Sequence, residues 1–326
     1  MPHAQLLSTT DGIVTLRPPG VGDEEVLIAG RDAEFHRWLG EGSRHPQPAN
    51  CIVVGGAVAG WVDFDACRQW LEPGEVNLGY SLFADRRGRG YGTRALQLLM
   101  HQLAVQSDVK TATLLIDPDN RASLALAARA RFVSSGQING QAYFKRAVPP
   151  LTYSDGVVTI RRHQPDDLEM HLAAVDDEQI DWLWDPGERE LWEAQTAAEK
   201  VNHMAGYLLS VHESFGRGPK WTFAVDLGGT SYIAYVDCDL ANAGTGPGEA
   251  NISYAAHPAF RRKGYVSRAV RLLARFLSDH TATRVAIIAV DPGNIASIRV
   301  AEAVGAVERD RVVTPHGRRV RFEIIL

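Results

Sequence analysis

The chain has 326 residues, of which 45% are hydrophobic and 22% charged, and its formal net charge at pH 7 is -5. These values are typical of a soluble globular protein with enough chain for two domains. The acidic balance excludes a protein whose whole surface binds polyanions, so we expect no nucleic-acid partner.

Hydrophobic patterns and turn residues predict alternating strands and helices in the first half of the chain. A helical segment with Trp38 follows the first strand, and a later strand runs into a loop of arginines and glycines. In the helix that leaves this loop, Leu96, Leu99, Met100 and Leu103 keep helical spacing. The expected strands are 13–17, 51–54, 58–64, 75–83 and 111–116, the main helix is 91–105, and a second helix and further β segments close the half.

The second half of the chain repeats this order. The stretch NLGYSLFADRRGRGYGTRALQLL at 77–99 is similar to NISYAAHPAFRRKGYVSRAVRLL at 251–273, an offset of 174 (251 minus 77). DPDNRASLALAARARFV at 117–133 and DPGNIASIRVAEAVGAV at 291–307 keep that offset, whereas TLRP at 15–18 and TIRR at 159–162 are offset by 144. The second copy therefore carries 30 additional residues (174 minus 144) between Trp182 and its next matched strand. Its expected strands are 157–161, 221–226, 231–237, 249–256 and 283–290, and its main helix is 265–279.

The boundary between the copies is expected near 148–156, where Pro149 and Pro150 disfavour continuation of a helix or a sheet. Strands followed by helix, strand and helix predict an α/β fold, with a mixed and mostly antiparallel sheet flanked by helices in each copy. We therefore predict two tandem domains, 1–150 and 151–326.

The loop RRGRGYGTRAL at 86–96 has the chemistry of an anion site. A glycine-rich turn that enters a helix directs several backbone N–H groups at one point, and the helix dipole adds partial positive charge. Glycines let a ligand approach the backbone, and Arg86, Arg87 and Arg89 add full charges. A pyrophosphate fits best. The loop lacks the Gly-Lys-Ser/Thr of a P-loop and the G-x-G-x-x-G of a dinucleotide fold.

The motif Arg87-x-x-Gly90-x-Gly92 resembles the R/Q-x-x-G-x-G/A signature of the GNAT acyl-CoA N-acyltransferases, and the DP-x-N-x-x-S stretch resembles the next block of that superfamily. The resemblance covers most of both halves and is closest in style to the ribosomal-protein N-terminal acetyltransferases. It implies acetyl-CoA as cofactor and transfer of an acetyl group to a primary amine of a small molecule or a peptide N-terminus.

The resemblance also implies which residues hold the cofactor. Backbone groups before the loop would hold the pantetheine arm, the loop and the first helical turn would hold the pyrophosphate, and the DP-x-N block would face the thiol end. In the first copy these are Leu82, Ala84, Arg87, Gly88, Arg89, Gly90, Tyr91, Gly92, Thr93, Asn120 and Ser123. In the second copy they are Ala256, Arg262, Lys263, Gly264, Tyr265, Val266, Ser267, Asn294 and Ser297. Arg262 and Val266 replace loop glycines, and Val266 predicts weaker binding there. For Asn120 and Asn294 a turn-and-cap role is the alternative.

Acyl transfer to an amine requires a base for the amine and a proton for the leaving thiolate. Asn77 and Asn251 stand where the family's pattern places glutamate, while Glu75 and Glu249 lie two residues earlier on the same strand face. We predict Glu249 or Asp237 as the base, directly or through water, with a solvated carboxylate at a strand end as the alternative. Ala127 and Ala301 replace the family's frequent tyrosine, so Ser297, or Ser123 in the first copy, is the candidate proton donor.

The segment after the first strand distinguishes the copies. The second copy has DDEQIDWLWDPGERELWEAQ at 176–195, whose acids and Trp182, Trp184 and Trp192 would suit a cationic amine. The alternative is an amphipathic helix with core tryptophans. We predict that the second copy is catalytic and that the first binds acyl-CoA with little or no turnover. A second hypothesis is a non-catalytic tandem module that binds or senses acyl-CoA.

Cysteine usage and apolar stretches bear on compartment and metal content. Cys51, Cys67 and Cys238 are scattered and fit neither a disulfide framework nor a metal-binding spacing. No signal-type leader opens the chain, and the longest apolar stretch, 52–62, is shorter than the roughly 20 residues of a membrane helix. We expect a cytoplasmic protein without a metal site or a membrane partner.

Overall fold

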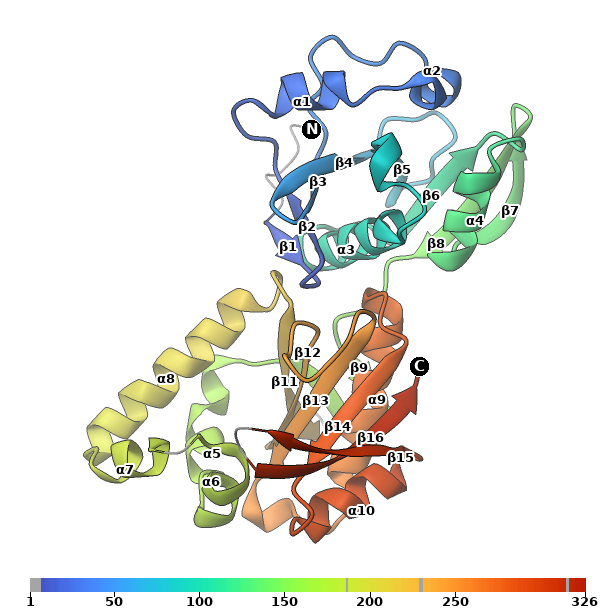
Figure 1. Ribbon diagram of the computed structural model, residues 1–326. Coiled ribbons are helices and arrows are strands. Elements are labelled where there is room, and N and C mark those ends of the chain that lie inside the picture. The colour runs from blue at the N-terminus through green and yellow to red at the C-terminus, as the bar shows by residue number, and fades with distance from the viewer. Residues whose placement is uncertain (1–6, 186, 229–230, 315–316) are drawn as a thin grey trace. The chain divides into compact units, whose positions relative to one another are not determined.

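The computed structural model describes residues 7–185, 187–228, 231–314 and 317–326. The chain forms two compact units (Figure 1). Unit one comprises residues 1–150 and 279–282, and unit two comprises residues 151–278 and 283–326.

Unit one is built on an eight-stranded sheet in the order β1-β2-β3-β4-β5-β6-β8-β7. Neighbouring strands are antiparallel except β5 and β6, which are parallel. The strands are β1 (Thr9–Thr10), β2 (Val14–Arg17), β3 (Asn50–Val54), β4 (Ala57–Asp65), β5 (Glu75–Leu82), β6 (Thr111–Ile116), β7 (Val133–Ile138) and β8 (Gln141–Ala147). The helices are α1 (Asp23–Ala29), α2 (Ala33–Leu39), α3 (Tyr91–Gln106) and α4 (Arg121–Arg129), with a short 3-10 turn η1 (Ala84–Arg86).

Unit two repeats this topology in the order β9-β10-β11-β12-β13-β14-β16-β15, and its parallel pair is β13 and β14. The strands are β9 (Tyr153–Ser154), β10 (Val158–Arg162), β11 (Lys220–Leu227), β12 (Ser231–Asp239), β13 (Glu249–Ala256), β14 (Val285–Val290), β15 (Val307–Thr314) and β16 (Gly317–Ile325). The helices are α5 (Leu168–Ala173), α6 (Asp177–Leu183), α7 (Glu188–Glu193), α8 (Ala197–Ser214), α9 (Tyr265–His280) and α10 (Ile295–Ala303), with 3-10 turns η2 (Pro165–Asp167) and η3 (Pro258–Phe260).

The long helix after the arginine–glycine loop supplies much of each core. In α3 the predicted apolar positions Leu96, Leu99, Met100 and Leu103 are all buried against the sheet of unit one. In α9, Leu272, Leu273, Phe276 and Leu277 are buried in the same way in unit two. The predicted α/β fold with two flanked, mostly antiparallel sheets is therefore confirmed.

The additional chain of the second copy forms helices. Between α6 and β11 it builds α7 and the 18-residue α8, whereas residues 40–49 of unit one form no regular element. Thr196 begins α8 with a capping box, in which its hydroxyl accepts the Glu199 N–H and the Glu199 carboxylate accepts the Thr196 N–H. The insertion thus extends the helical layer beside β10–β12. No helix among the described residues has the length and apolarity needed to cross a membrane.

Candidate functional site

The parallel strand pair of each unit separates after three residues. In unit one β5 pairs with β6 from Glu75 to Asn77, although β5 continues to Leu82. In unit two β13 pairs with β14 from Glu249 to Asn251, although β13 continues to Ala256. Each sheet therefore opens at the end that leads into the arginine–glycine loop.

Backbone groups of the longer strand face this opening. The Phe83 N–H bonds to the Ala59 carbonyl on β4, and successive backbone groups of a strand point to opposite edges, so the groups of Leu82 point toward the opening. In unit two the His257 N–H bonds to the Ile233 carbonyl, which places the groups of Ala256 at the opening. The strand ends named by the sequence interpretation thus lie where a ligand in the opening would meet backbone donors.

The loop that follows leaves a helix N-terminus without a side-chain cap. Gly88 and Gly90 have φ of 72° and 79°, and Gly90 is the N-cap of α3, whose first turn contains no acidic residue. A Cβ added at either glycine would meet no atom within 4 Å, so the space above the loop is open. Ala84 lies in η1 ahead of the loop, Arg89 is exposed, and Tyr91, Gly92 and Thr93 form the first helical turn.

The loop of unit two has the same backbone form despite its different residues. Gly264 has φ of 76°, and Arg262 adopts φ of 61° at the position that corresponds to Gly88. Residues other than glycine rarely adopt this left-handed conformation. Lys263 is exposed, and Tyr265, Val266 and Ser267 form the first turn of α9. The two loops therefore present similar backbones.

Val266 is accommodated by smaller neighbours. A Cβ at Gly92 would lie 2.6 Å from Leu126 Cδ1 and 3.4 Å from Leu82 Cδ1, so Gly92 is required by packing. In unit two Val300 replaces Leu126 and Ala256 replaces Leu82, and all three residues around this position pack against the core. The smaller neighbours leave room for the valine within the fold, and the weaker binding expected from its side chain near the pyrophosphate stays a prediction.

Arg87 of the loop is engaged within its own unit. The Arg87 guanidinium donates to Asp32 at 2.7 and 2.8 Å, to Glu34 at 2.9 Å and to the Leu82 carbonyl at 2.9 Å. The sequence interpretation gave this side chain a full positive charge at the anion. The contacts instead offset that charge with two carboxylates.

The DP-x-N blocks end in side-chain caps. Asn120 accepts the Ser123 N–H at 3.1 Å and begins α4, and Asn294 accepts the Ser297 N–H at 2.9 Å and begins α10. The turn-and-cap alternative is thereby confirmed for both asparagines. It leaves the Ser297 hydroxyl free of the cap, and this hydroxyl lies 2.8 Å from the Tyr254 hydroxyl of β13. Burial raises the pKa of Tyr254 to about 12, so the phenol holds its proton at neutral pH.

Glu75 and Glu249, which begin the parallel strand pairs, are held in ion pairs. Glu249 accepts the Gly246 N–H at 2.8 Å and pairs with Arg309 at 2.6 Å, and these contacts lower its pKa. Glu75 pairs with Lys145 at 2.6 Å, and although burial works against ionisation, this contact brings its pKa below the usual value. Both carboxylates are fixed and weakly basic, which makes them poor proton acceptors.

Asp237 has the opposite character. It lies on β12 opposite Ser253 of β13, only 4% exposed, and accepts a hydrogen bond of 2.6 Å from the Ser253 hydroxyl. Lys220 Nζ is 3.5 Å from its other oxygen. Burial raises the pKa of Asp237 despite these partners, which is the usual means of making a carboxylate more basic. Asn251 lies two pairs further along the ladder, opposite Asp239.

Unit one lacks this arrangement. At the offset of 174 Asp237 corresponds to Asp63, which accepts the backbone N–H groups of Ala49 and Phe64 at 3.1 and 2.9 Å. Its cross-strand neighbour is Gly79, which has no hydroxyl to donate. Ser253 was missed from the sequence because its pairing with Asp237 depends on strand register.

Most acidic side chains of the run 176–195 form ion pairs with arginines of unit two. Pro186 of this run lies outside the described residues. Arg189 pairs with Asp177, Asp181 and Glu193, and Asp176 and Glu178 pair with Arg261. Trp192 is buried with Ile180 and Met204, Trp184 packs beside it, and Trp182 is 38% exposed. These contacts favour the amphipathic-helix interpretation over an amine-binding one for Trp184 and Trp192.

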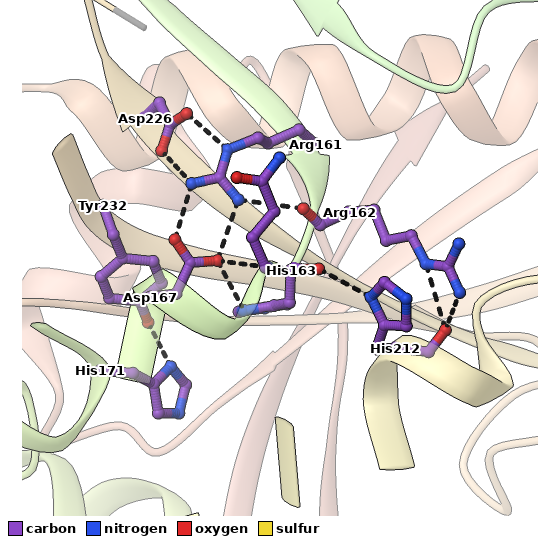
Figure 2. Close-up of polar contacts among 9 residues, drawn as sticks. Arg161, Arg162, His163, Asp167, His171, His212, Asp226 and Tyr232 are labelled. Carbon is purple, nitrogen blue, oxygen red and sulfur yellow. Dashed lines mark hydrogen bonds and ion pairs between the residues drawn. The ribbon is translucent and has the colours of Figure 1, made fainter. Parts of the chain in front are cut away.

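A buried polar cluster fixes α5 to the sheet (Figure 2). Arg161 lies between Asp167 and Asp226, with contacts of 2.6 to 2.9 Å, and the Tyr232 hydroxyl lies 2.7 Å from Nδ1 of His171. The rings of Tyr207 and Tyr235 lie 5.7 and 5.8 Å from that histidine. Tyr235 is two residues from Asp237 on the same strand, so this cluster forms one wall of the region beside the candidate base.

Each unit contains the same three features: a parallel strand pair that separates, a glycine loop that enters a long helix, and a second helix with an asparagine cap. Together they define a tandem protein of two similar α/β domains. The model of the acetyltransferase (GNAT) domain matches residues 21–133 and 158–307. The chain therefore belongs to the GNAT acetyltransferase family and carries its domain twice. A search of curated proteins found no significant match.

Several solved structures are similar to one half of the chain. The microcin C7 self immunity acetyltransferase MccE, in complex with acetyl-CoA and AMP, is 12% identical over 53% of this chain and 94% of its own, with a TM-score of 0.42. A putative ribosomal-protein-serine acetyltransferase from Vibrio cholerae is 15% identical over 55% and 99%, with a TM-score of 0.42. The aminoglycoside acetyltransferase AAC(6')-Ib, in complex with coenzyme A, is 22% identical over 52% and 94%, with a TM-score of 0.40.

Proposed function

We propose that the protein is an acetyl-CoA-dependent N-acetyltransferase, that both units bind acyl-CoA, and that unit two performs the transfer to a primary amine of a small molecule or a peptide N-terminus. The observation that carries the proposal is the doubled junction of parted strands, open glycine loop and uncapped helix. It offers backbone N–H groups to a pyrophosphate and an adjoining channel edge to the pantetheine arm. When bound, acetyl-CoA supplies an activated thioester.

The residues of unit two have separate tasks in this proposal. Gly264 to Ser267 hold the pyrophosphate through backbone groups, and Ala256 holds the pantetheine arm. A backbone N–H at the end of β13 faces the opening and stabilises negative charge that develops on the acyl oxygen. Asp237 accepts the proton of the attacking amine, directly or through a water molecule, because burial makes it more basic.

The proton required by the leaving thiolate comes from the hydroxyl pair of Ser297 and Tyr254. The two oxygens are 2.8 Å apart, and the phenol remains protonated at neutral pH. Tyr254 extends from the strand toward α10, where the family's frequent helical tyrosine is replaced by Ala301. The strand residue thus takes over a proton-donating position that the helix lacks.

For unit one, binding without turnover is favoured by a specific observation. Glu75 is held by Lys145, Asp63 accepts two backbone N–H groups, and Gly79 stands in place of Ser253. The loop of unit one is nevertheless complete, with Gly88, Gly90 and Gly92 all present.

Calorimetric titration of the full chain with acetyl-CoA tests the binding part of the proposal. We expect two molecules bound per chain. A glutamate at Gly90 should remove one site and a glutamate at Gly264 the other, since side chain and charge both oppose a pyrophosphate in the loop. Unchanged stoichiometry in both variants would contradict the assignment of the loops.

A further inference from the structure

Arg261, and its counterpart Arg87 in unit one, each connect three parts of their unit. Arg261 donates from Nε to the Ala256 carbonyl at 3.1 Å, from Nη1 and Nη2 to Asp176 at 2.7 and 2.8 Å, and from Nη1 to Glu178 at 2.7 Å. Ala256 ends β13, and Asp176 is the N-cap of α6, where it accepts the Gln179 N–H at 2.9 Å. Arg261 itself directly precedes the loop 262–267. One side chain therefore joins the strand end, the helix α6 and the loop; α6, and its counterpart α2 in unit one, are called the wall helix below.

The positive charge of Arg261 is offset by the carboxylates of Asp176 and Glu178. A guanidinium facing two carboxylates forms a group of net charge -1 and adds no attraction for a phosphate. The fork geometry of the contact with Asp176 is one that arginine makes and lysine cannot. The pKa of Asp176 is lowered, first by the hydrogen bond from Arg261, so the pair is ionised over the physiological range.

Unit one contains the same arrangement on a different length of chain. Arg87 contacts Asp32 and Glu34, which are 55 and 53 residues away, whereas Arg261 contacts Asp176 and Glu178, which are 85 and 83 residues away. The additional 30 residues between the contacting side chains include α7 and α8, which follow α6 in the chain. Neither helix supplies a residue to the contacts of Arg261 given above. Asp32 is again a helix N-cap, for α2, and the hydrogen bond from Arg87 lowers its pKa to about 2.

From this geometry we infer that Arg261 and Arg87 are positioning residues, each of which acts with the N-cap aspartate as a clamp that sets the loop backbone and the wall helix in one arrangement. The inference rests on the proposed acyl-CoA sites. The clamp transmits the position of the wall helix to the loop, so a residue that approaches no phosphate, Asp176, controls how well the loop binds one. It also makes α6 and the cofactor loop respond together.

Three variants in unit two separate a clamp from a direct phosphate contact. D176N keeps a good N-cap residue but removes the charge that orients Arg261. R261K keeps the positive charge but cannot form the fork, and R261Q loses both. If Arg261 acted by its charge on the phosphate, D176N would strengthen binding and R261K would preserve it. The clamp predicts that all three weaken acetyl-CoA binding, by about fivefold or more, and that D176N combined with R261Q is no worse than R261Q alone.

The measurement is calorimetric titration of the full chain with acetyl-CoA, with hydrogen exchange of residues 177–183 as a second readout. We expect the weakened site to be accompanied by faster exchange in α6, and D32N in unit one to weaken the other site while leaving α6 unchanged. Tighter or unchanged binding by D176N, with a wild-type chain that binds, would overturn the clamp alone. Failure of the wild-type chain to bind acetyl-CoA would overturn the proposed function and the clamp with it.

Discussion

Ser253 donates a hydrogen bond of 2.6 Å to Oδ1 of Asp237 across the ladder between β13 and β12. The bond favours the charged carboxylate, whereas burial favours the neutral one and raises the pKa of Asp237 above its usual value of 3.8. Their balance determines how basic the candidate catalytic carboxylate is.

This balance predicts a pH profile. Activity, as kcat/KM, should rise with pH as Asp237 loses its proton, with a midpoint above the ordinary aspartate value. S253A removes a hydrogen bond to the charged form, so the rising limb should move to higher pH by about one unit, given roughly 1.5 kcal/mol for such a bond and about 1.4 kcal/mol per pKa unit. Unit one offers no matching serine because Gly79 occupies this position, so the control is S253T, which keeps a hydroxyl and should leave the limb in place. A limb unmoved by S253A would argue against Asp237 as the base.

The close approach of Leu126 to Gly92 predicts that a larger residue at 92 is tolerated only when residue 126 is made smaller. G92V should destabilise unit one by about 1–3 kcal/mol, because the added side chain meets Leu126 Cδ1 at a distance that requires a shift. G92V combined with L126V reproduces two of the three residues of unit two, including the replacement at the shorter contact, and should recover most of the loss. Denaturant unfolding of the full chain measures both variants. Additive destabilisation in the double variant would show that the two sites do not share this space.

The buried histidines of unit two predict sensitivity to acid. Burial, and then the neighbouring His171, lower the pKa of His163 to about 3, and burial lowers that of His171 to about 4. Both are neutral in the folded chain but take up protons near pH 6.5 when it unfolds. Their depressed pKa values therefore give stability that is complete above pH 6.5 and is lost as the pH falls toward the folded values.

Replacement of one histidine isolates this effect. Neither ring nitrogen of His163 makes a hydrogen bond within the described part of the chain, and Nδ1 lies 3.6 Å from Oδ2 of Asp167, so H163F removes the titration and this one longer contact without breaking a hydrogen bond. Between pH 6.5 and 5 the variant should lose about 2 kcal/mol less than the wild type, at about 1.4 kcal/mol per pH unit for one proton. Urea unfolding of both chains at the two pH values provides the test, and an equal loss in both would rule the histidine out as a source.

The fold could be predicted largely from the sequence because local patterns determine it. The repeated blocks place each strand and helix within a few residues, and the apolar spacing of α3 identifies its buried face. The prediction of weaker binding at Val266 stays untested by the fold, which shows only that the valine is accommodated. The replacement of Leu126 by Val300, visible at the same offset, is the signal that explains how the valine fits.

Contacts between distant segments could not be predicted in this way. The loop motif indicates charge at Arg87, but its partner Asp32 lies 55 residues earlier and is known only once α2 meets the loop. Glu249 and Asp237 were equal candidates in the sequence. Only the contacts of Glu249 with Arg309 and Gly246, and the burial of Asp237 beside Ser253, distinguish a fixed carboxylate from a basic one.

The division of labour between the units is tested most directly by acetyl transfer from acetyl-CoA to a panel of primary amines, measured for the wild type, D237N and D63N. The two substitutions are the same chemical change at matching positions of the repeat. We predict that the wild type releases CoA in an amine-dependent manner, that D237N lowers the rate by about 10²-fold or more, and that D63N stays close to the wild type. Loss of activity in D63N with retention in D237N would place the active site in unit one, and no turnover of any amine by the wild type would contradict the proposed enzyme.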